Sequence, residues 1–298
     1  MSERTKRQPS IVGGILKFLG FMILAGVLIV VGFYCYLRFA LGIDLIDIKR
    51  KIDLINVKVE ESQIVTNAYD DSDAADGFAI IFNNEDIYKD NGDGYVFDKT
   101  AFENAGGLVA NVTLTDKQFA GIINVYMKNL FDNGENEDFA QNIKLKQIKF
   151  TNFSNQEEKT SVNMSAIAML DFSTIKSEIG KEDNFISGLL TSFIPESIYI
   201  NCNFKVIIDN TNPQDVEVES NYVLINNLTK EQSNEIFDFI NNFMGGNSNF
   251  MADTLTETFS TVLFGSETET SFFDKISGFS YFTFESDGTN IYLSIKKV

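Results

Sequence analysis

The chain has 298 residues, of which 44% are apolar, so it is long enough and apolar enough to bury a core. It carries 42 acidic against 24 basic residues, and the formal net charge of −18 opposes binding to phosphate backbones, which excludes a nucleic-acid function. It contains no histidine, which removes histidine-based general bases and every metal site that needs an imidazole ligand.

One uncharged apolar run, Phe18 to Leu37, lies near the start of the chain. A helix of this length spans a hydrocarbon core of about 30 Å. The run is longer than the apolar region of a signal peptide, and no small-residue cleavage site follows it, so we expect an uncleaved anchor. Residues 1–17 are then a basic cytoplasmic tail, and residues 18–41 are the transmembrane anchor.

Charge counting alone does not fix the orientation of this anchor, because the basic residues on its two sides nearly balance. We favour a cytoplasmic N-terminus, because a short basic tail before a long apolar run is the usual order of a signal anchor. Only one of the 42 acidic residues, Glu3, precedes the run. The sequence therefore predicts a single-pass protein of the cell membrane that contacts the bilayer through Phe18 to Leu37 and has an acidic extracytoplasmic body.

Residues 42–76 are expected to form a juxtamembrane linker. Within it, the period of Ile43 to Val59 fits a helix and a strand equally well. Residues 68–75 and the segment from Asp90 to Gly94 are expected to form acidic loops. In an EF-hand reading of the second loop, Lys89 would occupy the position of the first acidic ligand, so we favour a tight turn over a calcium site.

Two segments of the body begin in the same way, with Leu-Thr followed by Gln three residues after the Thr. Thr115 and Thr229 are predicted helix N-caps, and Gln118 and Gln232 complete their capping boxes. Apolar residues follow at helical spacing in both segments: Ile122, Val125, Tyr126 and Leu130 in the first, and Ile236, Phe239, Ile240 and Met244 in the second.

Each of these helices follows an alternating strand and precedes a pair of strands, so the body is predicted to be a duplicated β-β-α-β-β unit. The first unit, residues 77–180, has expected strands at Phe78–Phe82, Leu108–Thr113, Ile143–Phe150 and Ser161–Phe172. The second unit, residues 181–298, has expected strands at Ile198–Ile208, Val216–Ile225, Phe279–Phe284 and Asn290–Ile295, the last two joined at Asp287-Gly288. Additional amphipathic helices are expected over residues 184–193 and 250–264. The fold class is α+β, a transmembrane helix followed by a curved antiparallel sheet packed on amphipathic helices.

Alternation along the longest strands places apolar residues on one face of this sheet. Long strands with one apolar face tend to twist and curl. The enclosed face can then form an ordinary filled core with the amphipathic helices, or a groove that binds an apolar ligand. The residues expected to line such a groove are Ile122, Tyr126, Val162, Met164, Ile198, Ile200, Phe204, Val206, Ile236, Phe239 and Ile240.

The sequence offers few groups for catalysis, and we predict no enzyme, no cofactor and no metal site. Cys202 lies on the apolar face of its strand, where a packed neutral thiol is expected. Carboxylate pairs such as Glu217 and Glu219 are typical of the solvated face of a strand.

The order of strand, Leu-Thr-x-x-Gln helix and hairpin behind one anchor resembles Firmicute envelope proteins of the YpmS-like type and the wider tubular lipid-binding superfamily. The residues that carry the resemblance are Leu114 to Gln118, Leu228 to Gln232, and Phe193-Ile194-Pro195 before the strand at Ile198. It covers about residues 108–298. It implies a long helix in a strongly curved antiparallel sheet, and the binding or transfer of a lipid at the outer membrane face without a catalytic residue.

Two functional hypotheses follow. In the first, the curved sheet of a membrane-tethered domain holds a lipid or another apolar ligand between its strands and the two capped helices. In the second, the same residues form a closed core, and the domain is a structural or assembly component of the envelope with a protein or a cell-wall polymer as its partner.

Overall fold

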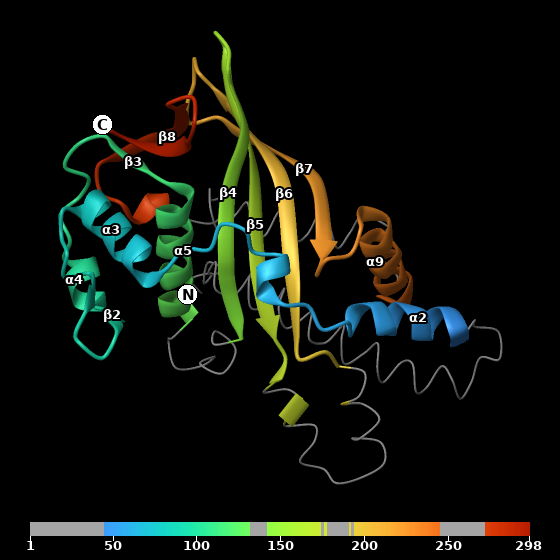
Figure 1. Cartoon of the computed structure of the whole chain (residues 1–298). Coiled ribbons are helices and arrows are strands. Elements are labelled where there is room, and N and C mark those ends of the chain that lie inside the picture. The colour runs from blue at the N-terminus through green and yellow to red at the C-terminus, as the bar shows by residue number, and fades with distance from the viewer. Residues whose placement is uncertain (1–44, 132–141, 174–175, 178–190, 192–193, 245–271) are drawn as a thin grey trace, which may run out of the picture.

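The computed structural model of the chain describes residues 45–131, 142–173, 176–177, 191, 194–244 and 272–298 (Figure 1). The predicted anchor, Phe18 to Leu37, and almost all of the two additional predicted helices, 184–193 and 250–264, lie outside these residues. Within the described part of the chain, no helix is long and apolar enough to cross a membrane. The described elements form an α+β fold with antiparallel sheets, as predicted.

The larger sheet has four strands in the order β4 (Ile143–Asn155), β5 (Lys159–Asp171), β6 (Ser197–Asp209) and β7 (Val216–Ile225). All three neighbouring pairs are antiparallel, and all four strands were predicted from their alternation. Strands β5 and β6 pair along their full length without a register shift. Because the side-chain period is two, this register keeps the apolar positions of both strands on the same face.

The smaller sheet has three strands in the order β3 (Val112–Leu114), β9 (Ile291–Lys297) and β8 (Phe279–Ser286). The predicted hairpin at Asp287-Gly288 is confirmed. In its turn, the Asp287 carboxylate accepts hydrogen bonds from the backbone N–H groups of Thr289 and Asn290, at 2.8 and 2.7 Å. Strand β3 belongs to the first predicted unit, whereas β8 and β9 belong to the second. The four-stranded and the three-stranded sheets therefore each contain strands from both predicted units.

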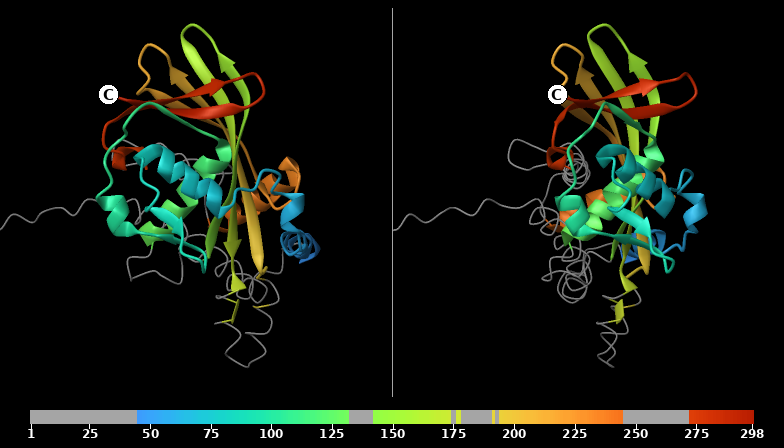
Figure 2. Two further views of the ribbon diagram at one scale, coloured as in Figure 1. Left: turned by 60° about the vertical axis from the view of Figure 1, so that its left-hand side comes forward. Right: turned by 90° about the vertical axis from the view of Figure 1, so that its left-hand side faces the viewer.

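Helix α5 (Asp116–Phe131) packs against β4 and against α3 (Asp71–Phe82), and helix α9 (Lys230–Met244) packs against β7. The crossing of α3 and α5 is close because both helices carry glycine there. A Cβ atom at Gly121 would lie 2.8 Å from the Ala74 Cβ atom, and one at Gly77 would lie 2.5 Å from Ile122 Cδ1. Figure 2 shows α3 and α5 on one side of the large sheet and the short helix η1 (Glu61–Gln63) on the other.

The predicted strand at Phe78–Phe82 is wrong, because these residues form the second half of α3. The helix begins inside the predicted acidic loop 68–75, where Asp70 and Asp73 form a reciprocal capping box with two distances of 3.0 Å. Acidic residues in a first helical turn are favoured by the helix dipole. Ala74, Phe78 and Ile81 then lie on one buried face at helical spacing, with no alternation.

The linker and the second acidic loop are resolved into local elements. Residues within Ile43 to Val59, whose period left helix and strand open, form helix α2 (Leu45–Ile55). The predicted tight turn from Asp90 to Gly94 is confirmed between β1 (Tyr88–Asp90) and β2 (Tyr95–Phe97), and it is closed by a 3.1 Å hydrogen bond from Asn91 N to Gly94 O. Two short helices complete the described elements, α4 (Lys99–Glu103) and η2 (Phe273–Lys275).

The predicted strand at Leu108–Thr113 is shorter than expected and lies further along the chain, because only Val112–Leu114 pairs as β3. Its first part is held instead by the segment between η2 and β8: the Leu108 N–H donates to Ser277 O at 2.7 Å. Gly107 makes this approach feasible, since a Cβ atom there would lie 2.1 Å from the Ser277 carbonyl oxygen. By contrast, a Cβ atom at the neighbouring Gly106 would have no atom within 4 Å.

We therefore expect Gly107→Ala to lower the free energy of unfolding by about 2 kcal/mol, the usual scale of an overpacked site, because backbone must move to admit the methyl group. Gly106→Ala is the matched control and should change stability by less than about 0.5 kcal/mol. Denaturant unfolding of the two variants measures the difference. Equal stabilities would contradict the close approach of residue 107 to Ser277.

Candidate functional site

The inner face of the large sheet is continuously apolar. It includes Val162, Met164 and Ala166 on β5 and Phe204 and Val206 on β6, and none of these five has any exposed surface. The residues belong to a single core cluster that also includes residues of α3, α5, α9, β8 and β9. The predicted direction of both strand faces is therefore confirmed.

The structure brings the expected groove residues together, and it buries those that it describes. In the same core cluster, Ile122 and Ile236 are fully buried, Ile200 is 3% exposed and Tyr126 is 6% exposed, while Ile198 is half-buried at its margin. The side chains of Phe239 and Ile240 lie outside the described residues. The described groove residues thus pack against other side chains of the chain itself.

Both predicted capping boxes are confirmed in the structure. The Thr115 hydroxyl accepts from Gln118 N at 3.1 Å, and the Gln118 side chain accepts from Thr115 N at 3.0 Å. The equivalent distances for Thr229 and Gln232 are 3.3 and 3.0 Å. A buried leucine precedes each cap: Leu114 is the last residue of β3, and Leu228 follows β7. These four polar residues fix the starts of the two helices.

Burial holds two titratable groups of the core, those of Cys202 and Tyr126, in their neutral forms. Cys202 is fully buried, and burial raises the pKa of its thiol, which keeps the sulfur protonated and unreactive. Burial also raises the pKa of Tyr126 to about 12. Within the described ranges, no group of three or more His, Cys, Asp or Glu side chains could hold a metal ion.

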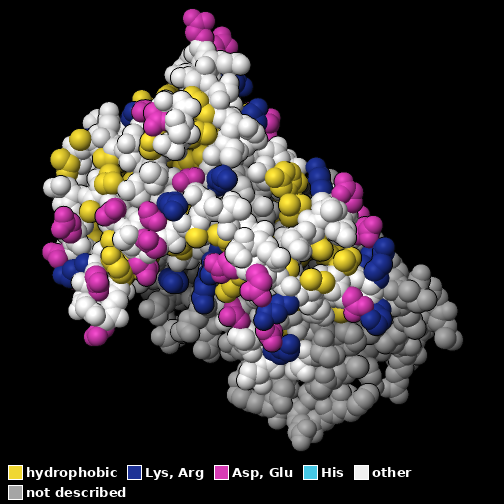
Figure 3. Space-filling view, in the orientation of Figure 1, with side chains coloured by type: hydrophobic (Ala, Val, Ile, Leu, Met, Phe, Trp, Pro, Cys, Tyr) yellow, Lys and Arg dark blue, Asp and Glu magenta, His cyan; other side chains and the backbone are white. Residues whose placement is uncertain are grey.

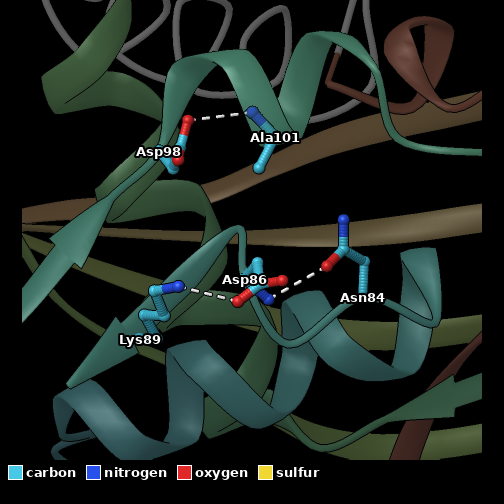
Figure 4. Close-up of polar contacts among 5 residues, drawn as sticks. All are labelled: Asn84, Asp86, Lys89, Asp98 and Ala101. Atoms are coloured by element: carbon cyan, nitrogen blue, oxygen red, sulfur yellow. Dashed lines mark hydrogen bonds and ion pairs between the residues drawn. The ribbon is translucent and has the colours of Figure 1, made fainter. Parts of the chain in front are cut away.

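Many acidic side chains are instead used in local turns and helix caps (Figure 4). Asp86 pairs with Lys89 at 2.7 Å, and its backbone N–H donates to the Asn84 side chain at 3.0 Å. Asp98 caps α4 by accepting from Ala101 N at 2.9 Å. Glu219, one of the predicted strand-face carboxylates, lies 4.0 Å from Lys205. These carboxylates therefore have partners within the chain itself.

The outer face of the large sheet is covered by the segment from Glu61 to Tyr69, which sequence reasoning missed. The Gln147 side chain, only 3% exposed, accepts from Thr66 N at 2.8 Å and from Asn67 N at 2.7 Å. Val65 packs on Ile167 and Tyr199 in a small second cluster. Because the partners lie far apart in the chain, no local pattern could have indicated this cover.

The same outer face carries charges of both signs. Lys146 pairs with Glu61 at 2.8 Å, and the Tyr199 hydroxyl donates to Glu61 at 3.3 Å. Burial, followed by the nearby Glu61 charge, raises the pKa of Tyr199 to about 12. Figure 3 views this side of the molecule and shows Lys and Arg side chains interspersed with Asp and Glu.

A cavity of about 380 Å³ lies beside the C-terminal end of α2, a feature that the sequence did not predict. Its walls are formed by residues 55–59, by the start of β6 with the residues before it, and by Lys176 and Asn226. The Asn226 side chain fixes two of these walls, since it accepts from Tyr199 N at 2.9 Å and donates to Ile55 O at 3.3 Å. A second cavity of about 620 Å³ adjoins it through Lys176, Glu196 and Ser197.

Comparisons of the chain with protein-family models, with curated proteins and with solved structures find no match. The resemblance to YpmS-like envelope proteins and to the tubular lipid-binding superfamily therefore stays a prediction. It rests on the two Leu-Thr-x-x-Gln helix starts and on the Ile194-Pro195 segment before β6.

Proposed function

We propose that the protein is a single-pass membrane protein whose acidic, non-enzymatic domain lies outside the cytoplasm and serves as a structural or assembly component of the cell envelope. The apolar run from Phe18 to Leu37 and the basic tail before it support the anchor and its orientation. Helix α2 begins only four residues after the predicted anchor ends at residue 41, so the described domain follows the bilayer closely.

The observation that carries the assembly role is the burial of the inner face of the large sheet. A groove that holds a ligand must leave part of its wall uncovered by the protein's own side chains. Ile122, Val162, Phe204 and Ile236 are fully buried in one cluster, which supports a packed core. A domain with a packed core acts through its exterior, and the acidic exterior of this chain suits a protein or a cell-wall polymer that carries basic groups.

A second candidate function is the binding or transfer of a lipid between the sheet and the two capped helices. The length of the apolar inner face favours it, because β5 and β6 each continue for 13 residues in unbroken register. The resemblance to lipid-binding envelope proteins points the same way. The two candidates differ in whether an uncharged apolar molecule stabilises the fold.

For the anchor and its orientation, we expect alkaline phosphatase fused after Val298 to be active and green fluorescent protein fused there to be dark, because the body is predicted to be extracytoplasmic. The same reporters placed before Met1 should give the opposite pattern. Fluorescence from the fusion at Val298 would show that the orientation is reversed.

For the packed core, we expect the melting temperature of the full chain in detergent to be unchanged when diacylglycerol, an uncharged apolar probe, is added. A ligand that binds only the folded state stabilises it by about 2.7 kcal/mol at a hundredfold excess over its dissociation constant. Circular dichroism at increasing diacylglycerol concentration measures the effect. A saturable rise of several degrees would favour the lipid-binding candidate over the assembly role.

A further inference from the structure

The cavity beside α2 is lined by the residues that directly follow this helix, and α2 is the first described element after the proposed anchor. Helix α2 has 11 residues and is about 16 Å long, and the cavity begins where it ends, at Ile55. The helix is fixed to the domain by the 3.0 Å ion pair from Arg50 to Glu235 and by burial of Ile52. Few residues therefore separate the end of the proposed anchor, residue 41, from the cavity, and most of them belong to α2.

The lining of this cavity combines cations with apolar surface. Lys58 and Lys176 both line it, and neither ammonium group has an ion pair or a hydrogen bond with another residue that the structure describes. By contrast, Lys49 on α2 is paired with Asp53. Glu196 also lines the cavity, so the two lysines exceed the carboxylates of its wall by one charge.

The remaining wall suits the carbon atoms that accompany an anionic group. Val57, Val59, Ile194 and Pro195 line the cavity, and Val57 is 50% exposed. A half-exposed valine beside two lysines whose ammonium groups have no partner among the described residues matches a ligand with a charged group attached to a glycerol or acyl carbon. The adjoining larger cavity adds Asp171 and hydroxyl side chains to its wall and suits an anion less well.

The wall is also held in place before any ligand binds. Asn226 joins the end of α2 to β6 through its two side-chain hydrogen bonds, and the Tyr199 hydroxyl is held by Glu61. A volume of about 380 Å³ is within the range of small-molecule sites. Pre-organised walls reduce the entropic cost of binding.

We propose that this cavity binds the phosphate-bearing headgroup of an anionic phospholipid from the membrane that anchors the chain. Lys58 and Lys176 contact the phosphate, and Val57, Ile194 and Pro195 contact the adjoining carbons. Binding would hold the domain against the bilayer in one orientation. This inference rests on the proposed membrane anchor, and it does not depend on whether the inner face of the sheet is a packed core.

The test uses the full chain in nanodiscs of phosphatidylcholine alone or of an equal mixture with phosphatidylglycerol. Amine acetylation followed by mass spectrometry gives the labelling rate of each lysine. We expect labelling of Lys58 and Lys176 to be about fivefold slower with phosphatidylglycerol, as for a site whose ligand is at about four times its dissociation constant. Lys49, which is exposed on α2, should keep its rate. Equal slowing of Lys49 would indicate a general surface effect and overturn the inference.

Two further experiments test whether the phosphate comes from a lipid and whether Lys58 and Lys176 share one site. Inorganic phosphate added to phosphatidylcholine discs should not protect either lysine, and equal protection would overturn assignment to a membrane lipid. Lys58→Gln should abolish the protection of Lys176, while Lys58→Arg and the distant control Lys99→Gln should retain it. Protection that persists in Lys58→Gln would contradict a shared site.

The outcomes separate this inference from the proposed function. If the fusion reporters place the domain in the cytoplasm, the proposed function fails, and the labelling of Lys58 and Lys176 still decides the headgroup site. If the domain is extracytoplasmic but lysine labelling does not depend on lipid composition, only the headgroup site fails.

Discussion

Burial of one continuous apolar face is the constraint on which the described fold depends. The inner faces of β5 and β6 alternate in register, so that Val162 pairs with Val206 and Met164 with Phe204 over the full length of both strands. A shift of one residue would turn this whole apolar set toward solvent and the polar set, such as Asn203, into the core. The helices and the smaller sheet contribute to the same cluster, so the burial of this face links elements from both ends of the described chain.

The two faces of the large sheet have different roles in this account. The inner face is packed with apolar side chains, whereas the outer face is crossed by a polar segment fixed by Gln147 and Glu61. That segment runs from α2 toward α3, where Phe78 contacts Tyr88 and Phe97. Several described charged groups lie in caps, turns and surface pairs, as expected of a domain that acts through its exterior.

Local patterns in the sequence predicted a large part of this structure. Alternation located β4 to β7 and the last hairpin, and the Thr-x-x-Gln spacing located the starts of α5 and α9. The error at Phe78–Phe82 arose because a short apolar run without alternation fits a buried strand and a helix equally well. Here the decisive signal was Asp70 with Asp73, a capping box made of acidic residues that the loop prediction had absorbed.

What the sequence could not indicate depends on contacts between distant residues. The cover over Gln147, the approach of Gly107 to Ser277 and the cavity between α2 and β6 each join segments that share no local pattern. The sequence also left open whether the enclosed face is a packed core or a ligand groove, because both need the same alternation. Burial of the individual side chains is the property that separates the two.

The most direct measurement of the central claim is the stability of Phe204→Ala in the full chain without added lipid. Phe204 has no exposed surface, so a packed inner face predicts a loss of about 3–5 kcal/mol in the free energy of unfolding. Lys205→Ala, on the opposite face of the same strand, should cost less than about 1 kcal/mol. If both substitutions cost the same small amount, the inner face is not a packed core, and this account is contradicted.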